Sequence, residues 1–313
     1  MVNKNIIIFG ALGQDGTFMC KKLKEDGFDV FGIIKKNSEK NNSVQGINYI
    51  ETNISKKYEI EKLIKKIKPI EVYNFMGVTN VLSPWDNPEE IYLKNFILPV
   101  KLLEAIKLHS IETRFLQSSS SLIFGNTDTN IQTETTKKKP IYHYGYSKYF
   151  VDELIKEYRI NFNLFLCSAI FYNHESEYRK EHFFTKKVIK QSFLITKGII
   201  DYIELGDLDS YRDFGYAGDY MDACIKIIRH NKPDDYIISS GNKIKLYDFV
   251  KIVFDKFNLD MSKNLKINKT LTRKNNLSNL VGDNSKLKSI GWEPSTDLNK
   301  IIDIMINHEI NSF

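Results

Sequence analysis

The sequence predicts an α/β fold in which a doubly wound parallel sheet carries a smaller C-terminal lobe. Short apolar runs alternate with longer stretches of helical periodicity through the first half of the 313 residues, as expected of strand–helix–strand units. The first apolar run leads directly into a glycine-rich turn, which is typical of the first strand of such a sheet. The second half shows no regular alternation, so we expect a lobe of different construction there.

The elements of the first half follow one another in a regular order. Runs rich in β-branched and aromatic residues predict strands at residues 6–9, 30–34, 72–76, 115–118 and 164–169. Apolar residues three and four apart predict helices at residues 16–26, 57–68, 89–108 and 147–161. Because parallel strands need a long, usually helical crossover, this order predicts a parallel sheet.

The second half predicts fewer elements. They are a loop and then a helix within 174–198, short strands at 202–205 and 236–239, and amphipathic helices at 246–257 and 298–310. We expect residues 1–170 to form a nucleotide-binding domain, with elements from about 214–240 returning to its sheet. Residues 171–213 and 241–313 would form a substrate lobe.

The composition is that of an ordinary globular protein. Hydrophobic residues make up 42% and charged residues 27%, which is enough for a full core. The net charge of +6 comes from 45 basic and 39 acidic residues spread along the chain. This excess fits a solvated surface or an anionic small ligand, and no nucleic-acid motif accompanies it.

Three isolated cysteines, Cys20, Cys167 and Cys224, have neither metal-ligand spacing nor a disulfide framework, which fits a reducing compartment. The apolar run at residues 6–9 is far too short for a signal peptide or a membrane span. We therefore expect a cytoplasmic protein with no metal, membrane or nucleic-acid partner.

Gly10, Gly13 and Gly16 form a G-x-x-G-x-x-G pattern between the first predicted strand and the first helix. Glycine permits the tight turn and lets a pyrophosphate approach the helix N-terminus, where N–H groups and the helix dipole favour negative charge. The pattern predicts a Rossmann-type dinucleotide site, which also includes Gln14 and Asp15.

The end of the second strand usually separates NAD from NADP, because an acid there binds the ribose hydroxyls. This chain instead has the sequence I-I-K-K-N at residues 33–37. Lys35 and Lys36 could meet a 2′-phosphate or could be solvated loop residues. Both cofactors stay open on this ground, with Lys35 as a candidate contact.

Tyr144 and Lys148 lie four residues apart near the start of a predicted helix, so their side chains share one face. A free tyrosine has a pKa near ~10, and a nearby lysine cation and an oxidised nicotinamide would lower it until the phenol can act as a base. Ser120, at the end of the preceding strand, would hold the reacting oxygen. Tyr142 and Tyr146 lack a lysine four residues later. The trio predicts hydride transfer with a nicotinamide cofactor.

These motifs resemble those of the extended short-chain dehydrogenase/reductases, and the resemblance to the GDP-mannose 4,6-dehydratases covers nearly the whole chain. The segment F-Y-N-H-E-S at residues 171–176 resembles that family's F-N-H-E-S. The other similar segments are F-T-K-K at 184–187, G-D-L-D-S-Y-R-D at 206–213, Arg273 followed by G-D at 282–283, and G-W-E-P at 291–294.

The resemblance implies further site residues. His174 and Arg179 would approach the cofactor, and Asn53 and Ile54 would contact its adenine. Phe75 and Gly77, at the end of the strand at 72–76, are also assigned to the cofactor. The residues that would hold the sugar nucleotide are Ser120, Asn173, Phe184, Lys187, Arg212, Arg273 and Asn276. Cations among them suit a diphosphate, and Asn276 replaces a family glutamate, so its ribose contact stays open.

The chain departs from the dehydratases at Leu122. In those enzymes a carboxylate two residues after the catalytic Ser/Thr removes the C5 proton once C4 is oxidised, and water leaves C6. Counting back from Gly125 places Ser120 at the Ser/Thr and Leu122 at the acid. The pattern is then most similar to the GDP-D-glycero-D-manno-heptose 4-dehydrogenases of capsule pathways. That likeness implies NAD-dependent oxidation of a GDP-sugar to a 4-keto product, without dehydration, for surface polysaccharide synthesis.

Three other interpretations stay open. Asp128 or Glu134 could reach in as a displaced carboxylate and make the enzyme a 4,6-dehydratase. The chemistry could run backwards, as in a GDP-4-keto-6-deoxy-sugar reductase, or the chain could be a catalytically silent nucleotide-binding protein. A C4 oxidase would retain NADH and would need cofactor exchange or a 2-keto acid as hydride acceptor. The resemblance also implies a homodimer or homotetramer, through the helix that carries Tyr144.

Overall fold

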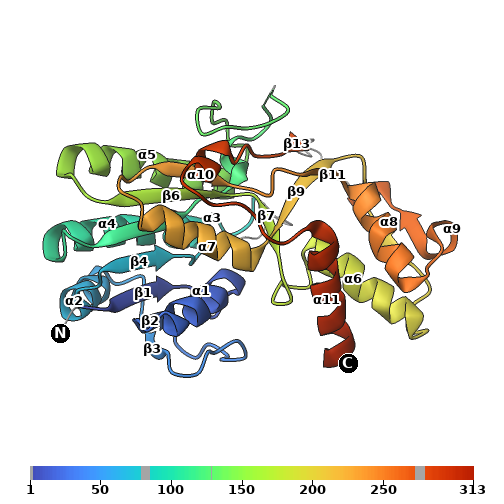
Figure 1. Cartoon of the computed structure of the whole chain (residues 1–313), viewed down its shortest axis with the longest axis horizontal. Helices are drawn as coiled ribbons and strands as arrows, with labels where there is room; N and C mark the ends of the chain where they lie inside the picture. The colour runs from blue at the N-terminus through green and yellow to red at the C-terminus, as the bar shows by residue number, and fades with distance from the viewer. Residues whose placement is uncertain (1–2, 79–84, 128, 272–278) are drawn as a thin grey trace.

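A computed structural model describes residues 3–78, 85–127, 129–271 and 279–313 (Figure 1). The main sheet has seven strands in the order β10-β6-β5-β4-β1-β2-β3, and every neighbouring pair is parallel. The strands are β1 (Asn5–Phe9), β2 (Asp29–Ile34), β3 (Asn48–Glu51), β4 (Glu71–Asn74), β5 (Arg114–Ser118), β6 (Leu166–Phe171) and β10 (Asp235–Ile238). This order confirms the predicted doubly wound α/β sheet.

Helices cover both faces of the sheet, because each strand presents apolar side chains to both. In β1, Ile6 and Ile8 pack with Met19 of one core cluster, while Ile7 and Phe9 belong to a second cluster. The first face is covered by α1 (Gln14–Glu25) and α7 (Ala217–Ile228), and the second by α2 (Lys57–Ile67), α4 (Leu98–His109) and α5 (His143–Phe162). A strand buried on both faces explains the continuous apolar run at the N-terminus.

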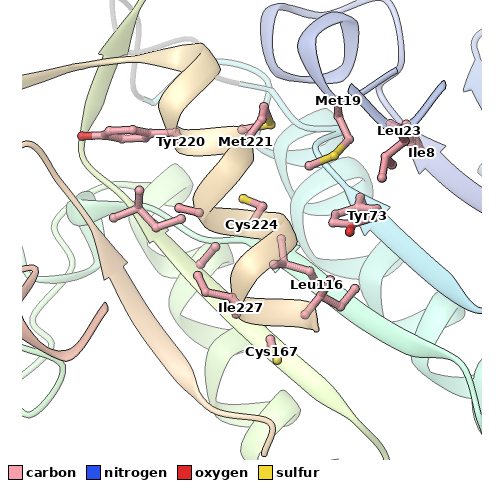
Figure 2. Packing of buried hydrophobic residues seen from close by; sticks show 14 of the residues in the cluster. Ile8, Met19, Leu23, Tyr73, Leu116, Cys167, Tyr220, Met221, Cys224 and Ile227 are labelled. Atoms are coloured by element: carbon pink, nitrogen blue, oxygen red, sulfur yellow. The ribbon is translucent and has the colours of Figure 1, made fainter. Parts of the chain in front are cut away.

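Helix α7 closes the first face with a row of apolar side chains. Figure 2 shows Met221, Cys224 and Ile227 of α7 above the sheet residues Leu116 and Cys167. All three cysteines of the chain are buried and free. Burial raises the pKa of the Cys167 thiol to about 12, so this thiol is an inert core group rather than a reactive one.

The helix predicted at 89–108 is interrupted. It is divided into α3 (Pro88–Tyr92), a π-helical turn (Leu93–Ile97) and α4. Pro99 lies in the first turn of α4, and because proline has no N–H, the regular hydrogen-bond ladder cannot pass through it. The helix that carries Tyr144 begins at His143, four residues before the predicted start.

The second half forms a lobe beside the main sheet (Figure 1). Its helices are α6 (Phe184–Thr196), α8 (Leu246–Phe257), α9 (Met261–Asn264) and α11 (Leu298–Ser312), and α10 (Ser285–Ser289) packs near β10. Its strands are β7 (Asn173–Glu175), β9 (Tyr211–Tyr216), β11 (Lys243–Lys245) and β13 (Asn279–Leu280), which form one small sheet, and the parallel pair β8 (Ile203–Leu205) and β12 (Leu265–Ile267). Strand β10 and helix α7 lie between these segments in sequence but belong to the main body.

Neither a membrane-spanning helix nor a metal-binding cluster occurs among the described residues. No helix among them is both long and apolar enough to cross a membrane. They also contain no group of three or more His, Cys, Asp or Glu side chains arranged to hold a metal ion.

Candidate active site

The glycine turn between β1 and α1 brings the end of the sheet against the start of the helix. Gly10 has φ +81°, and a Cβ there would lie 2.9 Å from the backbone nitrogen of Met76. A Cβ at Gly16 would lie 2.2 Å from the carbonyl oxygen of Gly10. Gly13 is the N-cap of α1 and provides no capping side chain. The N–H groups and the positive dipole end of α1 therefore suit the pyrophosphate of a dinucleotide.

Gly77 lies beyond the end of β4 and close to Lys148. A Cβ at this position would lie 3.7 Å from Lys148 Nζ and 2.8 Å from Asn95 Oδ1, so a side chain would fill the space next to Lys148. Phe75 instead stacks on Phe171, with ring centroids 6.4 Å apart. Of the two residues assigned to the cofactor here, Gly77 lies close to Lys148, and Phe75 packs against Phe171 of β6.

The remaining residues assigned to the cofactor lie at the ends of β2 and β3. Lys35 is exposed just after β2, with no acid beside it in sequence. Asn53 follows β3, and its Oδ1 accepts a hydrogen bond from the backbone nitrogen of Ser55 at 3.0 Å. Lys101 Nζ donates to the carbonyl oxygen of Ile54 at 2.9 Å. These bonds fix the loop after β3 at the edge where an adenine would lie.

Ser120, Tyr144 and Lys148 come together where β5 ends and α5 begins. The Tyr144 hydroxyl interacts with the Ser120 side chain, and this interaction favours the phenolate. Ser120 Oγ also accepts the backbone N–H of Leu122 at 3.3 Å. Lys148 Nζ donates to the carbonyl oxygen of Ser118 at 2.7 Å and lies 5.9 Å from the centroid of the Tyr144 ring. The arrangement can hold a hydroxyl or carbonyl oxygen between Ser120 and Tyr144.

Burial dominates the electrostatics of Tyr144 and Lys148. Burial raises the pKa of Tyr144, and the interaction with Ser120, which favours the phenolate, does not offset this. Burial also lowers the pKa of Lys148 to about 8, although Asp152 and Asp15 favour its cation. Burial therefore favours the neutral phenol of Tyr144 in the protein alone, and the lowering expected with a bound oxidised nicotinamide stays a prediction.

Leu122 lies in a 3-10 turn, Ser121–Ile123, directly after Ser120. Its side chain packs against an apolar cluster that includes Ile123 and Phe124. No proton-transferring group therefore stands two residues after Ser120.

Two glycines fix the register around Leu122. Gly125 has φ +60°, and a Cβ there would lie 1.9 Å from the carbonyl oxygen of Lys139. A Cβ at Gly145 would lie 2.8 Å from the carbonyl oxygen of Leu122. Helix α5 can approach the turn closely because glycine follows Tyr144, and this approach brings the Tyr144 hydroxyl to Ser120.

The structure shows where Glu134, one of the two candidates for a displaced catalytic carboxylate, is bound. Glu134 Oε1 accepts the backbone N–H of Ile237 in β10 at 2.9 Å, and β10 is two strands away from β5. Glu134 is thus bound at the sheet edge rather than beside Ser120. Asp128 lies outside the described residues.

The glycine loop is tied to the lobe through the segment that begins at β7. His174 Nε2 and Asp15 Oδ1 are 2.9 Å apart, and His174 Nδ1 lies 2.8 Å from the carbonyl oxygen of Tyr172. Gln14 Nε2 donates to the carbonyl oxygen of His174 at 3.1 Å, and Ser176 Oγ donates to Gln14 Oε1 at 2.8 Å. Gln14, Asp15 and His174, all assigned to the cofactor, therefore meet in one network.

The His174–Asp15 pair is an ion pair in a buried setting. Burial disfavours both charges, but the attraction between the partners outweighs it, so the pKa of His174 is raised and that of Asp15 is lowered. The Asp15 carboxylate consequently stays charged beside Tyr144 and Lys148.

Arg179 connects this network with a cavity in the lobe. Its Nε lies 3.0 Å from Glu175 Oε2, and its guanidinium stands 3.6 Å above the centroid of the Phe183 ring. Glu175 also accepts a hydrogen bond from Thr185 Oγ1 at 2.5 Å. The cavity has a volume of about 230 Å³, and its lining residues are Asn173, Glu175, Arg179, His182, Phe183, Phe184, Thr185, Gly206, Asp207, Leu208, Arg212, Phe214, Leu246 and Leu271.

Apart from Ser120, which lies in the trio, the predicted substrate residues fall into three groups. Asn173, Phe184 and Arg212 line the cavity. Lys187 Nζ donates to the carbonyl oxygen of Glu204 at 2.9 Å and is not among the lining residues. The predicted contacts Arg273 and Asn276 lie outside the described residues.

Sequence reasoning missed several residues that the structure brings to the site. Glu175, His182 and Phe183 line the cavity. Asp152 lies on α5 one turn beyond Lys148 and accepts a hydrogen bond from Ser119. The signal for Asp152 was present, because it follows Lys148 by the same four residues that separate Lys148 from Tyr144.

Comparison with known proteins places the chain in a family. The family model described as GDP-mannose 4,6 dehydratase matches residues 7–305. GDP-mannose 4,6 dehydratase 1 of Arabidopsis thaliana is 30% identical over 329 aligned positions, which cover 98% of this chain and 90% of that protein.

Solved structures support the fold. UDP-glucose 4-epimerase of Thermotoga maritima, solved with UDP-glucose, superposes with a TM-score of 0.89 at 20% identity and covers 98% of this chain and 99% of that one. UDP-glucose 4-epimerase of Thermus thermophilus, a complex with NAD, has a TM-score of 0.87 at 18% identity, with 99% and 100% covered. The chain therefore belongs to the GDP-mannose 4,6-dehydratase family of the extended short-chain dehydrogenase/reductases, and it is a sugar-nucleotide-modifying enzyme of that group.

Proposed function

We propose that the protein oxidises C4 of a GDP-sugar to the ketone with NAD and stops there, without eliminating water. The observation that carries this proposal is the combination of a complete Ser120–Tyr144–Lys148 trio with Leu122 two residues after Ser120. The trio provides a proton acceptor and a cation for hydride transfer. Leu122 cannot act as the acid or base that dehydration requires.

The residues of the trio have separate roles. Ser120 Oγ and the Tyr144 hydroxyl hold the C4 oxygen of the sugar between them, and Tyr144 accepts its proton. Lys148 provides positive charge close to Tyr144, which favours the phenolate during that step. The hydride acceptor for C4 would be supplied by a bound nicotinamide cofactor. The raised pKa of Tyr144 in the protein alone means that the phenolate gains its support only when the site is filled.

Dehydration requires a further base and acid at C5 and C6. Leu122 packs into an apolar cluster, and Glu134 is bonded to the backbone of β10. Asp15 is paired with His174, and its position in the glycine loop assigns it to the cofactor. These contacts engage Leu122, Glu134 and Asp15 elsewhere, which supports a site without a base for the C5 proton.

The cofactor proposal rests on the loop geometry. The glycine turn and the N-terminus of α1 fit a dinucleotide, and the Thermus thermophilus relative was solved as a complex with NAD. The positive charge of Lys35 would also suit the 2′-phosphate of NADP. The assay below therefore compares NAD with NADP. A 4-dehydrogenase ends its turnover with reduced cofactor, and we propose exchange or a 2-keto acid as the route of reoxidation.

The substrate proposal rests on the lobe. Arg179 and Arg212 line the cavity together with Phe183 and Phe184, which provides cations for a diphosphate and apolar surface for a nucleoside. The curated relative is a GDP-mannose dehydratase by name, and we propose a GDP-mannose-type sugar, GDP-manno-heptose in particular.

The test is an assay of reduced-cofactor formation from NAD and from NADP with a panel of GDP-sugars, using Tyr144→Phe and Tyr146→Phe as a matched pair. Tyr146 lies on the same helix but is 39% exposed. We expect NADH with a GDP-manno-sugar, loss of at least ~100-fold in Tyr144→Phe because proton transfer by a positioned side chain contributes that much, and near wild-type rates in Tyr146→Phe. Full activity in Tyr144→Phe would sink the mechanism. Oxidation of NADPH by a 4-keto sugar, with no forward reaction, would favour the reductase instead.

A further inference from the structure

Three consecutive serines at the end of β5 each interact with a different residue of α5. Ser118 accepts the Lys148 ammonium through its carbonyl oxygen at 2.7 Å and its hydroxyl at 3.3 Å. Ser120 interacts with the Tyr144 hydroxyl. The middle serine, Ser119, donates its hydroxyl to Asp152 Oδ2 at 2.6 Å. The strand end that presents Ser120 is thus fastened to the helix at three points.

The three helix residues share one face. Tyr144, Lys148 and Asp152 follow one another at intervals of four, which aligns their side chains along the helix. Asp152 is completely buried, and its second oxygen, Oδ1, accepts the hydroxyl of Ser168 from β6 at 2.5 Å. One carboxylate therefore links α5 to two neighbouring strands of the sheet.

Charged groups surround Asp152 on every side. Lys138 Nζ, in the loop before α5, lies 3.7 Å from Asp152 Oδ2, and the Lys138 side chain is itself 8% exposed. Lys148 lies one turn earlier on the same helix, and Asp235 of β10 acts on Asp152 from the sheet edge. Burial raises the pKa of Asp152, while Lys138 and the two serine hydroxyls favour its charged form. Asp152 in turn is the leading charge that favours the ammonium of Lys148 against burial.

We propose that Asp152 is a positioning residue of this enzyme: it fixes Ser119, and through it Ser120, against α5, and it keeps the buried Lys148 charged. The inference rests on the proposed function in giving Ser120, Tyr144 and Lys148 their roles. A carboxylate is needed for both tasks. It can accept hydrogen bonds from two hydroxyls at once, and its negative charge stabilises the ammonium of a buried lysine.

The first experiment follows Lys148 directly and needs no substrate. Lysine side-chain NMR of the full chain, with the Lys148 signal assigned from a Lys148→Arg variant, gives the pKa of Lys148 in wild type and in Asp152→Asn. We expect a pKa below the wild-type value of about 8 in Asp152→Asn, because the favourable charge is gone. The matched control is Glu153→Gln, which removes one negative charge at the neighbouring position. Glu153 is 46% exposed and pairs with Lys138 and Lys156. The pKa of Lys148 should therefore stay unchanged in this variant. An equal Lys148 pKa in wild type and Asp152→Asn would overturn the proposal.

The second experiment uses kinetics to separate the two roles of Asp152, which are to position Ser120 and to keep Lys148 charged. The Ser119→Ala variant keeps the Asp152 carboxylate but removes its hydrogen bond to the segment that carries Ser120. We expect kcat to fall roughly 10- to 100-fold with KM little changed, because misplacement of a reacting group can cost that much, and the Lys148 pKa to stay as in wild type. In Asp152→Asn the alkaline decline of kcat should also begin at lower pH. If Asp152→Asn does not fold, Ser119→Ala decides, and an unchanged kcat contradicts the positioning role.

The two proposals fail in different ways. A wild-type protein that oxidises no GDP-sugar, together with a lowered Lys148 pKa in Asp152→Asn, would refute the proposed function and leave the charge role of Asp152 standing. A normal 4-dehydrogenase in which neither variant changes kcat or the Lys148 pKa would refute the role of Asp152 alone.

Discussion

The proposed chemistry depends on individual residues and on the absence of a carboxylate at position 122. Ser120, Tyr144 and Lys148 were predictable because each belongs to a motif whose spacing has a physical meaning, and the structure brings all three together. Leu122 was predictable in position because Gly125 fixes the turn. The raised pKa of Tyr144 was not predictable, because it depends on burial by segments distant in sequence.

The His174–Asp15 ion pair gives a prediction at the scale of single residues. The pKa of His174 is raised above 6.5, so its contribution to stability is complete below that value and is lost as pH rises through the folded-state pKa. The pKa of Asp15 is lowered below 3.8, so its contribution is present above that value and is lost as pH falls through the folded-state pKa. The pair therefore stabilises most between these limits.

Thermal unfolding at a series of pH values measures the contribution of the His174–Asp15 pair to stability. His174→Gln and Asp15→Asn, with the double variant, form a cycle whose coupling free energy should be about 0.5–3 kcal/mol in that window and should shrink as pH rises above 6.5. A coupling that grows with rising pH, or that is zero at pH 6, would show that the two side chains are not an ion pair.

At the scale of elements, the site depends on how closely α5 approaches the turn after β5. Most strands and helices of the main body were predictable, since their periodicity is local, but β3 and α7 were not among the predicted elements. The four-residue error at the start of α5 arose because its first turn carries aromatic and glycine residues that give no helical signal. Strands β7 and β11 are three residues long, and such short strands are defined by their partner β9 rather than by their own sequence.

Gly145 tests that close approach. A Cβ there would lie 2.8 Å from the Leu122 carbonyl oxygen and 3.1 Å from Pro140 Cβ, so Gly145→Ala must push α5 away from the turn. Although alanine favours helices, we expect a loss of about 1–3 kcal/mol in stability, as for other overpacked sites, and a lower kcat. Urea unfolding and the NADH assay measure the two effects. Glu157→Ala, at an exposed position of α5, is the control and should change stability by less than ~0.5 kcal/mol. A stabilised and fully active Gly145→Ala protein would contradict this account of the site.

At the scale of the whole molecule, α5 also offers a surface for association. Tyr146 and Phe150 are 39% and 41% exposed, and Ile97, next to Phe96 in sequence, is 38% exposed. Phe150 contacts Phe96 and Tyr146, with ring centroids 6.0 Å apart in both cases. Exposed apolar side chains that gather in this way are typical of interfaces, and we expect a second copy of the chain to cover them.

Light scattering after size exclusion tests the association. Wild type should elute as a dimer or tetramer, and Phe150→Glu should dissociate it by placing a charge in the apolar patch. Glu157→Ala on the same helix serves again as the control and should leave the assembly intact. A monomeric wild type, or an unchanged oligomer in Phe150→Glu, would place the interface elsewhere or remove it. The sequence could suggest this interface only by likeness to other proteins, because exposure is a property of the folded chain.

The central claim concerns the reaction itself, and the mass of the sugar-nucleotide product tests it most directly. The protein is incubated with NAD and a GDP-manno-sugar, and the product is analysed by mass spectrometry after brief reaction. The absence of a carboxylate at Leu122 predicts a product that has lost two hydrogens relative to the substrate, with NADH formed in equal amount. A product that has lost one water, with no net NADH, would contradict the account and show that the enzyme is a dehydratase.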